Sequence, residues 1–123
     1  MSIINTDKAP AAIGPYSQAV TVNGVLYTSG QIPIDPATGN LVEGDIKVQA
    51  EQVMKNLMAI VEAAGADPKK TVKTLCFLKS MDDFTAFNEV YAEYFPGKPA
   101  RSCVEVAALP KGALCEVEII VAM

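Results

Sequence analysis

The sequence predicts a two-layer α+β domain in which two helices cover one face of a mixed β-sheet. Two observations support this fold class. Segments with strand-like alternation open and close the chain, and two segments with helical periodicity lie between them, separated by a further strand-like segment. The expected order is β-β-α-β-α-β-β. With 123 residues, half of them apolar, the chain suits a single domain spanning residues 1–123.

The first two strands are predicted over residues 17–22 and 25–29. The dipeptide Asn23-Gly24 separates them and favours a type I′ turn, in which both central residues have positive φ. Near the N-terminus, Ile3 and Ile4 indicate a further short strand. Residues 35–40 are rich in turn formers and are expected to be a loop.

The first helix is predicted to begin after Asp45, a capping residue, and to end before Gly65, which suits the position after a helix. Apolar side chains recur at three- and four-residue spacings, as on the buried side of an amphipathic helix. These residues are Ile46, Ala50, Val53, Met54, Leu57, Ile60, Val61 and Ala64.

Residues 71–79 are β-branched and aromatic with alternation, so we expect a strand there. Ser80 and Asp83 then resemble a capping box that opens a second helix. Pro96 and Gly97 end that helix. Its apolar stripe is Phe84, Phe87, Tyr91 and Phe95.

The last quarter of the chain is predicted to form a hairpin of residues 101–109 and 114–121. If the loop at 109–113 joins them directly, matching the apolar faces puts four polar side chains on one surface. They are Arg101, Cys103, Glu116 and Glu118. An arginine can bind a carboxylate through two hydrogen bonds, and a nearby glutamate can move protons to or from water. The alternative is a solvated sheet face with no chemistry.

The composition argues against several classes of protein. A net charge of −4 disfavours nucleic-acid binding, and the absence of histidine removes the commonest general base and imidazole metal ligands. Three unpaired cysteines suit reduced thiols in the cytoplasm. No membrane span, signal peptide or acidic metal cluster is evident, so we expect neither membrane, metal nor cofactor.

Six short stretches spread along the chain resemble the recurrent motifs of the RidA/YjgF family. The chain has Pro-Ala-Arg-Ser-Cys-Val-Glu-Val at 99–106, followed by Leu-Pro-Lys at 109–111 and Glu-Val-Glu at 116–118. Upstream are Ile-Gly-Pro-Tyr-Ser-Gln-Ala at 13–19, Tyr-Thr-Ser-Gly-Gln-Ile-Pro at 27–33 and a Phe-x-x-Phe-Asn-x-x-Tyr pattern at 84–91. The resemblance covers nearly the whole chain.

The resemblance implies a chorismate-mutase-like fold and a homotrimer with clefts between subunits. It also implies hydrolytic deamination of 2-aminoacrylate/2-iminopropanoate and 2-aminocrotonate/2-iminobutanoate, which gives 2-keto acids and ammonia without a cofactor. A physical argument also favours an oligomer, because two helices cover only one face of the sheet. We expect the other face to expose Cys103, Leu114 and Ile120.

By the same resemblance, Arg101 binds the substrate carboxylate with help from the backbone N–H of Cys103. Glu116 activates the attacking water, although strand parity alone does not separate it from Glu118. Tyr16 lines the cleft and is the residue expected from the neighbouring subunit. The rest of the pocket is Ser29, Gly30, Phe84 and Asn88.

Two other functions remain open from the sequence. One is a non-catalytic sensor that holds a small 2-keto or amino acid at the cleft. Binding alone would give Glu116 no role. The other is a ribonuclease or translation inhibitor, which the acidic charge and the missing histidine disfavour.

Overall fold

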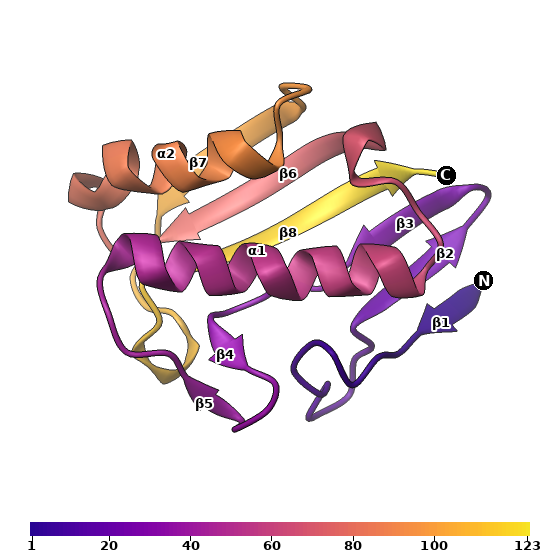
Figure 1. Cartoon of the computed structure of the whole chain (residues 1–123), viewed down its shortest axis with the longest axis horizontal. Helices are drawn as coiled ribbons and strands as arrows, with labels where there is room; N and C mark the ends of the chain where they lie inside the picture. Colours follow the sequence, from indigo (N-terminus) through magenta and orange to yellow (C-terminus); the bar gives the residue numbers. More distant parts are fainter.

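The computed structural model describes residues 1–123 and confirms an α+β architecture. Helices α1 (Ile46–Ala63) and α2 (Phe84–Tyr94) pack side by side on one face of a six-stranded sheet (Figure 1). The strand order is β1-β2-β3-β8-β6-β7. The strands are β1 (Ser2–Ile4), β2 (Ala19–Val22), β3 (Val25–Thr28), β6 (Thr71–Leu78), β7 (Ala100–Glu105) and β8 (Cys115–Ala122).

The N-terminal part of the sheet follows the prediction closely. Val22 pairs with Val25 across a turn whose Asn23 and Gly24 have φ values of 50° and 74°, as a type I′ turn requires. The short strand near Ile3 and Ile4 is present as β1, which pairs with β2. The predicted loop is present as the turn over residues 36–39, and it joins the strands of a small hairpin, β4 (Ile34–Asp35) and β5 (Asn40–Leu41).

Helix α1 begins and ends where its sequence predicts. The Asp45 side chain accepts a hydrogen bond from the Val48 N–H, and Gly65 follows the helix with a φ of 70°. The predicted apolar stripe faces the sheet, where all its members are buried except Ala64, which packs against the core.

The start of α2 differs in one detail from the predicted capping box. A 3₁₀ turn at Met81–Asp83 precedes the helix, and the Ser80 side chain caps that turn by accepting from the Asp82 N–H. Asp83 at the start of α2 makes no side-chain capping bond. The predicted stripe is nevertheless correct, because Phe87, Tyr91 and Phe95 are buried and Phe84 packs against them.

The predicted C-terminal hairpin is wrong, because β6 lies between β7 and β8. Strand β8 pairs antiparallel with β6, whereas β7 pairs with β6 in parallel. A parallel pair needs a crossover, and α2 supplies it between β6 and β7. The residues after β7 pass the end of β6 before the chain enters β8, with Lys79 N donating to Leu114 O at 3.0 Å.

The true register changes the face to which Arg101 belongs. Arg101 and Cys103 pair with Thr74 and Cys76, whose side chains are buried under the helices. In contrast, Glu116 pairs with Phe77 and therefore projects from the opposite face. The prediction that Arg101, Cys103, Glu116 and Glu118 share one surface is wrong for a single chain.

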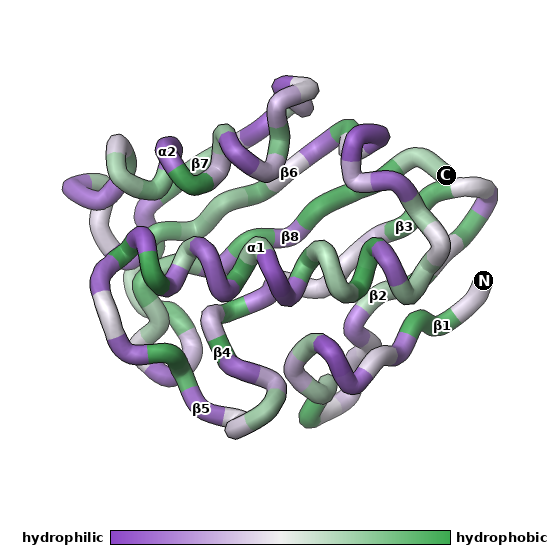
Figure 2. The backbone as a smooth tube through the Cα atoms, viewed as in Figure 1, coloured by the Kyte–Doolittle hydropathy of each residue, from purple (hydrophilic) through white to green (hydrophobic).

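The open face of the sheet carries no helix. The side chains of β8 alternate between the two faces: one row is apolar and buried under the helices, and the other, on the open face, contains Glu116, Glu118 and Ile120. Figure 2 shows this alternation of hydropathy. Tyr27 and Val104 lie on the same open face and are 41% and 46% exposed. Ile120 is on this face as expected, whereas Cys103 and Leu114 pack against the core.

Candidate active site

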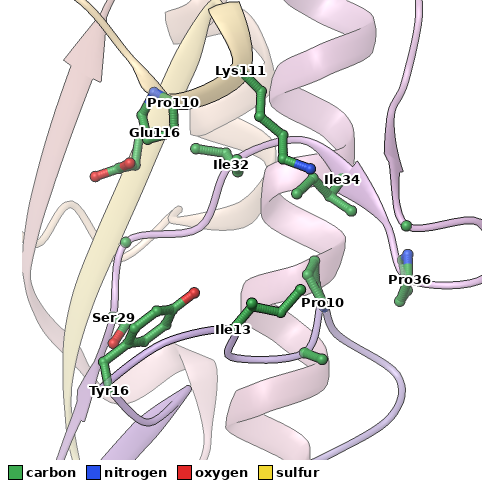
Figure 3. Close-up of a pocket in the computed structure, with 13 residues that line it drawn as sticks. Pro10, Ile13, Tyr16, Ser29, Ile32, Ile34, Pro36, Pro110, Lys111 and Glu116 are labelled. Carbon is green, nitrogen blue, oxygen red and sulfur yellow. The ribbon is translucent and has the colours of Figure 1, made fainter.

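A cavity of about 560 Å³ opens beside the end of β8 that carries Glu116. Three segments distant in sequence form its walls: the loop before β2, the stretch between β3 and β5, and the turn before β8 (Figure 3). The lining residues are Pro10, Ala11, Ile13, Tyr16, Ser29, Gly30, Ile32, Ile34, Pro36, Gly39, Pro110, Lys111 and Glu116.

One end of this cavity is polar and contains four predicted site residues: Tyr16, Ser29, Gly30 and Glu116. The Ser29 hydroxyl donates to Ser17 O at 2.6 Å, so backbone contacts fix this side chain. Figure 3 shows the Tyr16 ring beside Ser29, with Glu116 projecting from the neighbouring strand.

Gly30 leaves room for the close approach of the Glu116 side chain. A Cβ atom at Gly30 would lie 2.8 Å from the Glu116 Cδ atom, so any side chain there would displace the carboxylate. Two hydrogen bonds join Gln31 to Val117, at 2.9 and 3.2 Å, and hold the two segments together. The backbone at Gly30 therefore packs directly against the carboxylate.

Glu116 is half-buried, and burial raises the pKa of its carboxyl, with a further contribution from the negative charge of Glu118. A raised pKa suits a group that must both accept and donate a proton near neutral pH. Glu118 projects from the same face but does not line the cavity. Geometry therefore separates the two glutamates, which strand parity could not do.

Arg101 lies in a second, smaller cavity of about 300 Å³ on the other face of the sheet. Its guanidinium lies 4.6 Å from the centre of the Tyr91 ring and 5.5 Å from that of Phe84. Its Nη1 donates to Asn88 Oδ1 at 2.7 Å. No carboxylate pairs with Arg101, since the only ion pair in the chain joins Lys47 to Glu89.

Cys103 does not line either cavity. Its partner in the register is Cys76, and burial raises the pKa of both thiols, that of Cys76 to about 12. Neither thiol is therefore a ready nucleophile. The role predicted for Cys103 is to bind the substrate carboxylate through its backbone N–H, and that role does not depend on where its side chain lies.

The predicted site residues thus form two groups in one chain. Tyr16, Ser29 and Gly30 accompany Glu116, whereas Phe84 and Asn88 surround Arg101. Arg101 and Glu116 pair with opposite edges of β6, three positions apart. Their Cα atoms are thus separated by roughly 10 Å along the strands and roughly 10 Å across them, with the side chains pointing apart.

Comparison with known proteins places this arrangement in a family. The family model described as Endoribonuclease L-PSP matches residues 6–123. The mouse 2-iminobutanoate/2-iminopropanoate deaminase is 51% identical over 119 residues, which are 96% of this chain and 88% of that protein. A RutC family protein of Pyrococcus horikoshii is 54% identical over 96% of this chain and 94% of its own length.

Solved structures of similar proteins have the same fold as this chain. RidA from a Psychrobacter species superposes with a TM-score of 0.95 at 48% identity and full coverage of both chains. Escherichia coli TdcF with bound serine has a TM-score of 0.95 at 42% identity, covering 100% of this chain and 99% of that one. The chain belongs to the RidA family.

In this RidA-family protein, Lys111 is a cavity residue that the sequence argument did not select as functional. It has a φ of 57° and reaches over the cavity from a short turn (Figure 3). A lysine in the left-handed region is unusual, and no pattern in the sequence predicts this conformation. The chain has no cluster of three or more side chains suited to metal binding, and no helix long and apolar enough to span a membrane.

Proposed function

We propose that this chain hydrolyses the imines of small 2-amino acids, 2-iminopropanoate and 2-iminobutanoate, to 2-keto acids and ammonia. The observation that carries the proposal is the pair of incomplete sites. A guanidinium without a carboxylate partner lies on one face, and a half-buried glutamate beside a cavity lies on the other. An imino acid needs both groups, one for its carboxylate and one for its C=N bond.

The active site that we propose lies between two copies of the chain. A three- or four-carbon acid is too short to reach Arg101 and Glu116 around the sheet of one subunit. A ring in which the Glu116 cavity of one subunit meets the Arg101 surface of the next would bring the two groups together. The uncovered open face supplies apolar surface for such an assembly, and we propose a homotrimer.

The chemistry then requires only positioning and proton transfer. Arg101 holds the carboxylate through its free N–H groups, while Asn88 and the rings of Phe84 and Tyr91 fix the guanidinium plane. Water held by Glu116 adds its oxygen to C2, and a proton goes to the imine nitrogen. The resulting carbinolamine loses ammonia as the hydroxyl proton is removed, which leaves the C=O bond of the 2-keto acid.

The relatives support this proposal. The mouse and rat proteins, both 51% identical to this chain, are named as deaminases of these imines. The TdcF structure holds serine, a small 2-amino acid with the same carboxylate.

That bound serine also favours a second candidate, a sensor that holds a small amino or keto acid without turnover. The two candidates differ in whether Glu116 has a chemical role. A receptor for carboxylates gains nothing from a second negative charge near the ligand.

Turnover decides between them. A threonine dehydratase acting on serine generates 2-aminoacrylate, and the decay of its imine is followed with and without this protein. We expect faster decay and pyruvate formation that saturate with imine concentration. An unchanged rate, together with measurable binding of serine or pyruvate, would reject the enzyme and favour the sensor.

A further inference from the structure

Two buried side-chain amides lie behind the walls of the cavity, and the proposed mechanism uses neither. Gln18, directly before β2, and Asn56 in α1 are each 1% exposed. A buried amide that satisfies its hydrogen bonds specifies one arrangement of its partners. The backbone partners of both residues belong to the segments that form the cavity walls.

Gln18 holds the segment that forms one wall. Its Nε2 donates to Thr6 O at 2.9 Å, Ala9 O at 3.3 Å and Pro10 O at 2.8 Å, and its Oε1 accepts from the Thr6 N–H at 2.7 Å. Pro10 and the following Ala11 line the cavity. This wall has no sheet bonds of its own, so the Gln18 side chain replaces them.

Asn56 holds the opposite wall in the same way. Its Nδ2 donates to Ile32 O at 3.2 Å and to Ile34 O at 2.9 Å, while its Oδ1 accepts from Gln52 Nε2 at 2.9 Å. The side chains of Ile32 and Ile34 both line the cavity. A hollow of about 70 Å³ is lined by residues of both walls and by Gln18.

We infer that Gln18 and Asn56 are positioning residues that fix the separation of the two walls. In doing so they set the size of the substrate side chain that the cavity accepts. The inference rests on the proposed function. The apolar part of the cavity lies beyond the polar end that holds Glu116, where the side chain of an imino acid would extend. Size selection requires rigid walls, because a flexible wall adapts to either substrate.

The test compares two imino acids in variants that remove the amides at nearly constant volume, Gln18→Met and Asn56→Leu. One substrate is 2-iminopropanoate, and the other carries the branched side chain of leucine; an amino-acid oxidase generates both. We expect the ratio of kcat/KM for the two substrates to change by at least about five-fold in each variant. For 2-iminopropanoate, kcat should stay within about three-fold of the original value, because neither amide touches Glu116 or Arg101.

Gln49→Met is the matched control. Gln49 is a third buried amide, and it binds Val42 O at 3.2 Å and Leu114 N at 2.9 Å, neither of which lines the cavity. This variant should lose thermal stability like the others while keeping the substrate ratio. An unchanged ratio in both test variants, or an equal change in the control, would overturn the inference.

Two further measurements test the inference if a variant does not fold or if the protein does not hydrolyse imines. Gln18→Asn and Asn56→Ser keep these positions polar and uncharged, and the same ratio applies if the apolar variants do not fold. Hydrogen exchange of the Thr6 amide, which donates to Gln18 Oε1, should accelerate in Gln18→Met, and exchange of the Gln31 and Ile34 amides should accelerate in Asn56→Leu. Neither change should occur in Gln49→Met. Absence of imine hydrolysis in the unmodified protein would reject the proposed function alone, whereas unchanged exchange would reject the positioning role.

Discussion

Arg101 and Glu116 project from opposite faces of the same sheet, on either side of β6. The guanidinium lies against α2, whereas the carboxylate lines the cavity formed by the loop before β2, the stretch from β3 to β5 and the turn before β8. One subunit therefore contains both groups without bringing them to one small molecule.

The first prediction concerns mixed oligomers of two inactive variants, Arg101→Ala and Glu116→Gln. Each variant alone lacks one half of every site. After co-refolding in equal amounts, about one quarter of the sites should combine an intact Glu116 from one subunit with an intact Arg101 from its neighbour. The imine assay should recover about that fraction of the original rate.

The control for this experiment mixes Glu116→Gln with Tyr16→Ala. Both residues line the same cavity of one chain, so no arrangement of subunits restores a complete site. Recovery in the control, or none in the first mixture, would contradict a site shared between subunits.

The sequence predicted much of the fold because most of its signals are local. The Asn23-Gly24 turn, the Asp45 cap and the apolar stripe of α1 each depend on neighbouring residues, and all are present. Strand pairing is not local. The alternation in residues 101–109 is compatible with pairing either to β6 or to β8, and the short loop before β8 favours a direct hairpin with β8.

The error in pairing then led to the wrong face for Arg101. A charged side chain was expected on the open face, but the rings of Tyr91 and Phe84 and the amide of Asn88 give its guanidinium a place under α2. The pattern of Phe84, Asn88 and Tyr91 was visible in the sequence. Their spacing on one side of a helix could have indicated a partner, although it does not identify Arg101 as that partner.

The second prediction separates the two glutamates of β8. Glu116→Gln should lower the rate of imine hydrolysis by on the order of 10²-fold or more, the usual effect of losing a positioned acid or base. Glu118→Gln should retain most of the rate, because Glu118 does not line the cavity. Equal losses in both variants would remove the special role of Glu116.

The same substitution gives a third prediction, on stability. Burial raises the pKa of Glu116 in the folded state, so folding favours its protonated form. The resulting stability is present below the usual value of 4.5 and is lost as pH rises through the raised pKa. Glu116→Gln should therefore increase the midpoint temperature at pH 7, and the difference should disappear below about pH 4.5 in thermal melts across that range.

The fourth prediction concerns the fork of Arg101. Arg101→Lys should restore little of the activity lost in Arg101→Ala, because an ammonium neither forms two parallel hydrogen bonds nor stacks on Tyr91 in the same way. Asn88→Ala removes the 2.7 Å bond that orients the guanidinium, and we expect a loss of about ten-fold, mainly in KM. Steady-state kinetics of the three variants tests this order, and a lysine variant near full activity would contradict it.

The last prediction tests the close approach of Gly30 to Glu116. In Gly30→Ala the new Cβ atom would lie 2.8 Å from the Glu116 Cδ atom, so the carboxylate must move away from the position that holds water. A displacement of about 1 Å at a reacting group costs about 10²-fold in rate. Gly97→Ala is a fair comparison, because a Cβ atom there would have only Lys69 O nearby, at 3.8 Å, and its rate should not change. If the loss acts through Glu116, adding Gly30→Ala to Glu116→Gln should reduce the rate no further. An additional loss in that double variant would show that Gly30 contacts the substrate by itself.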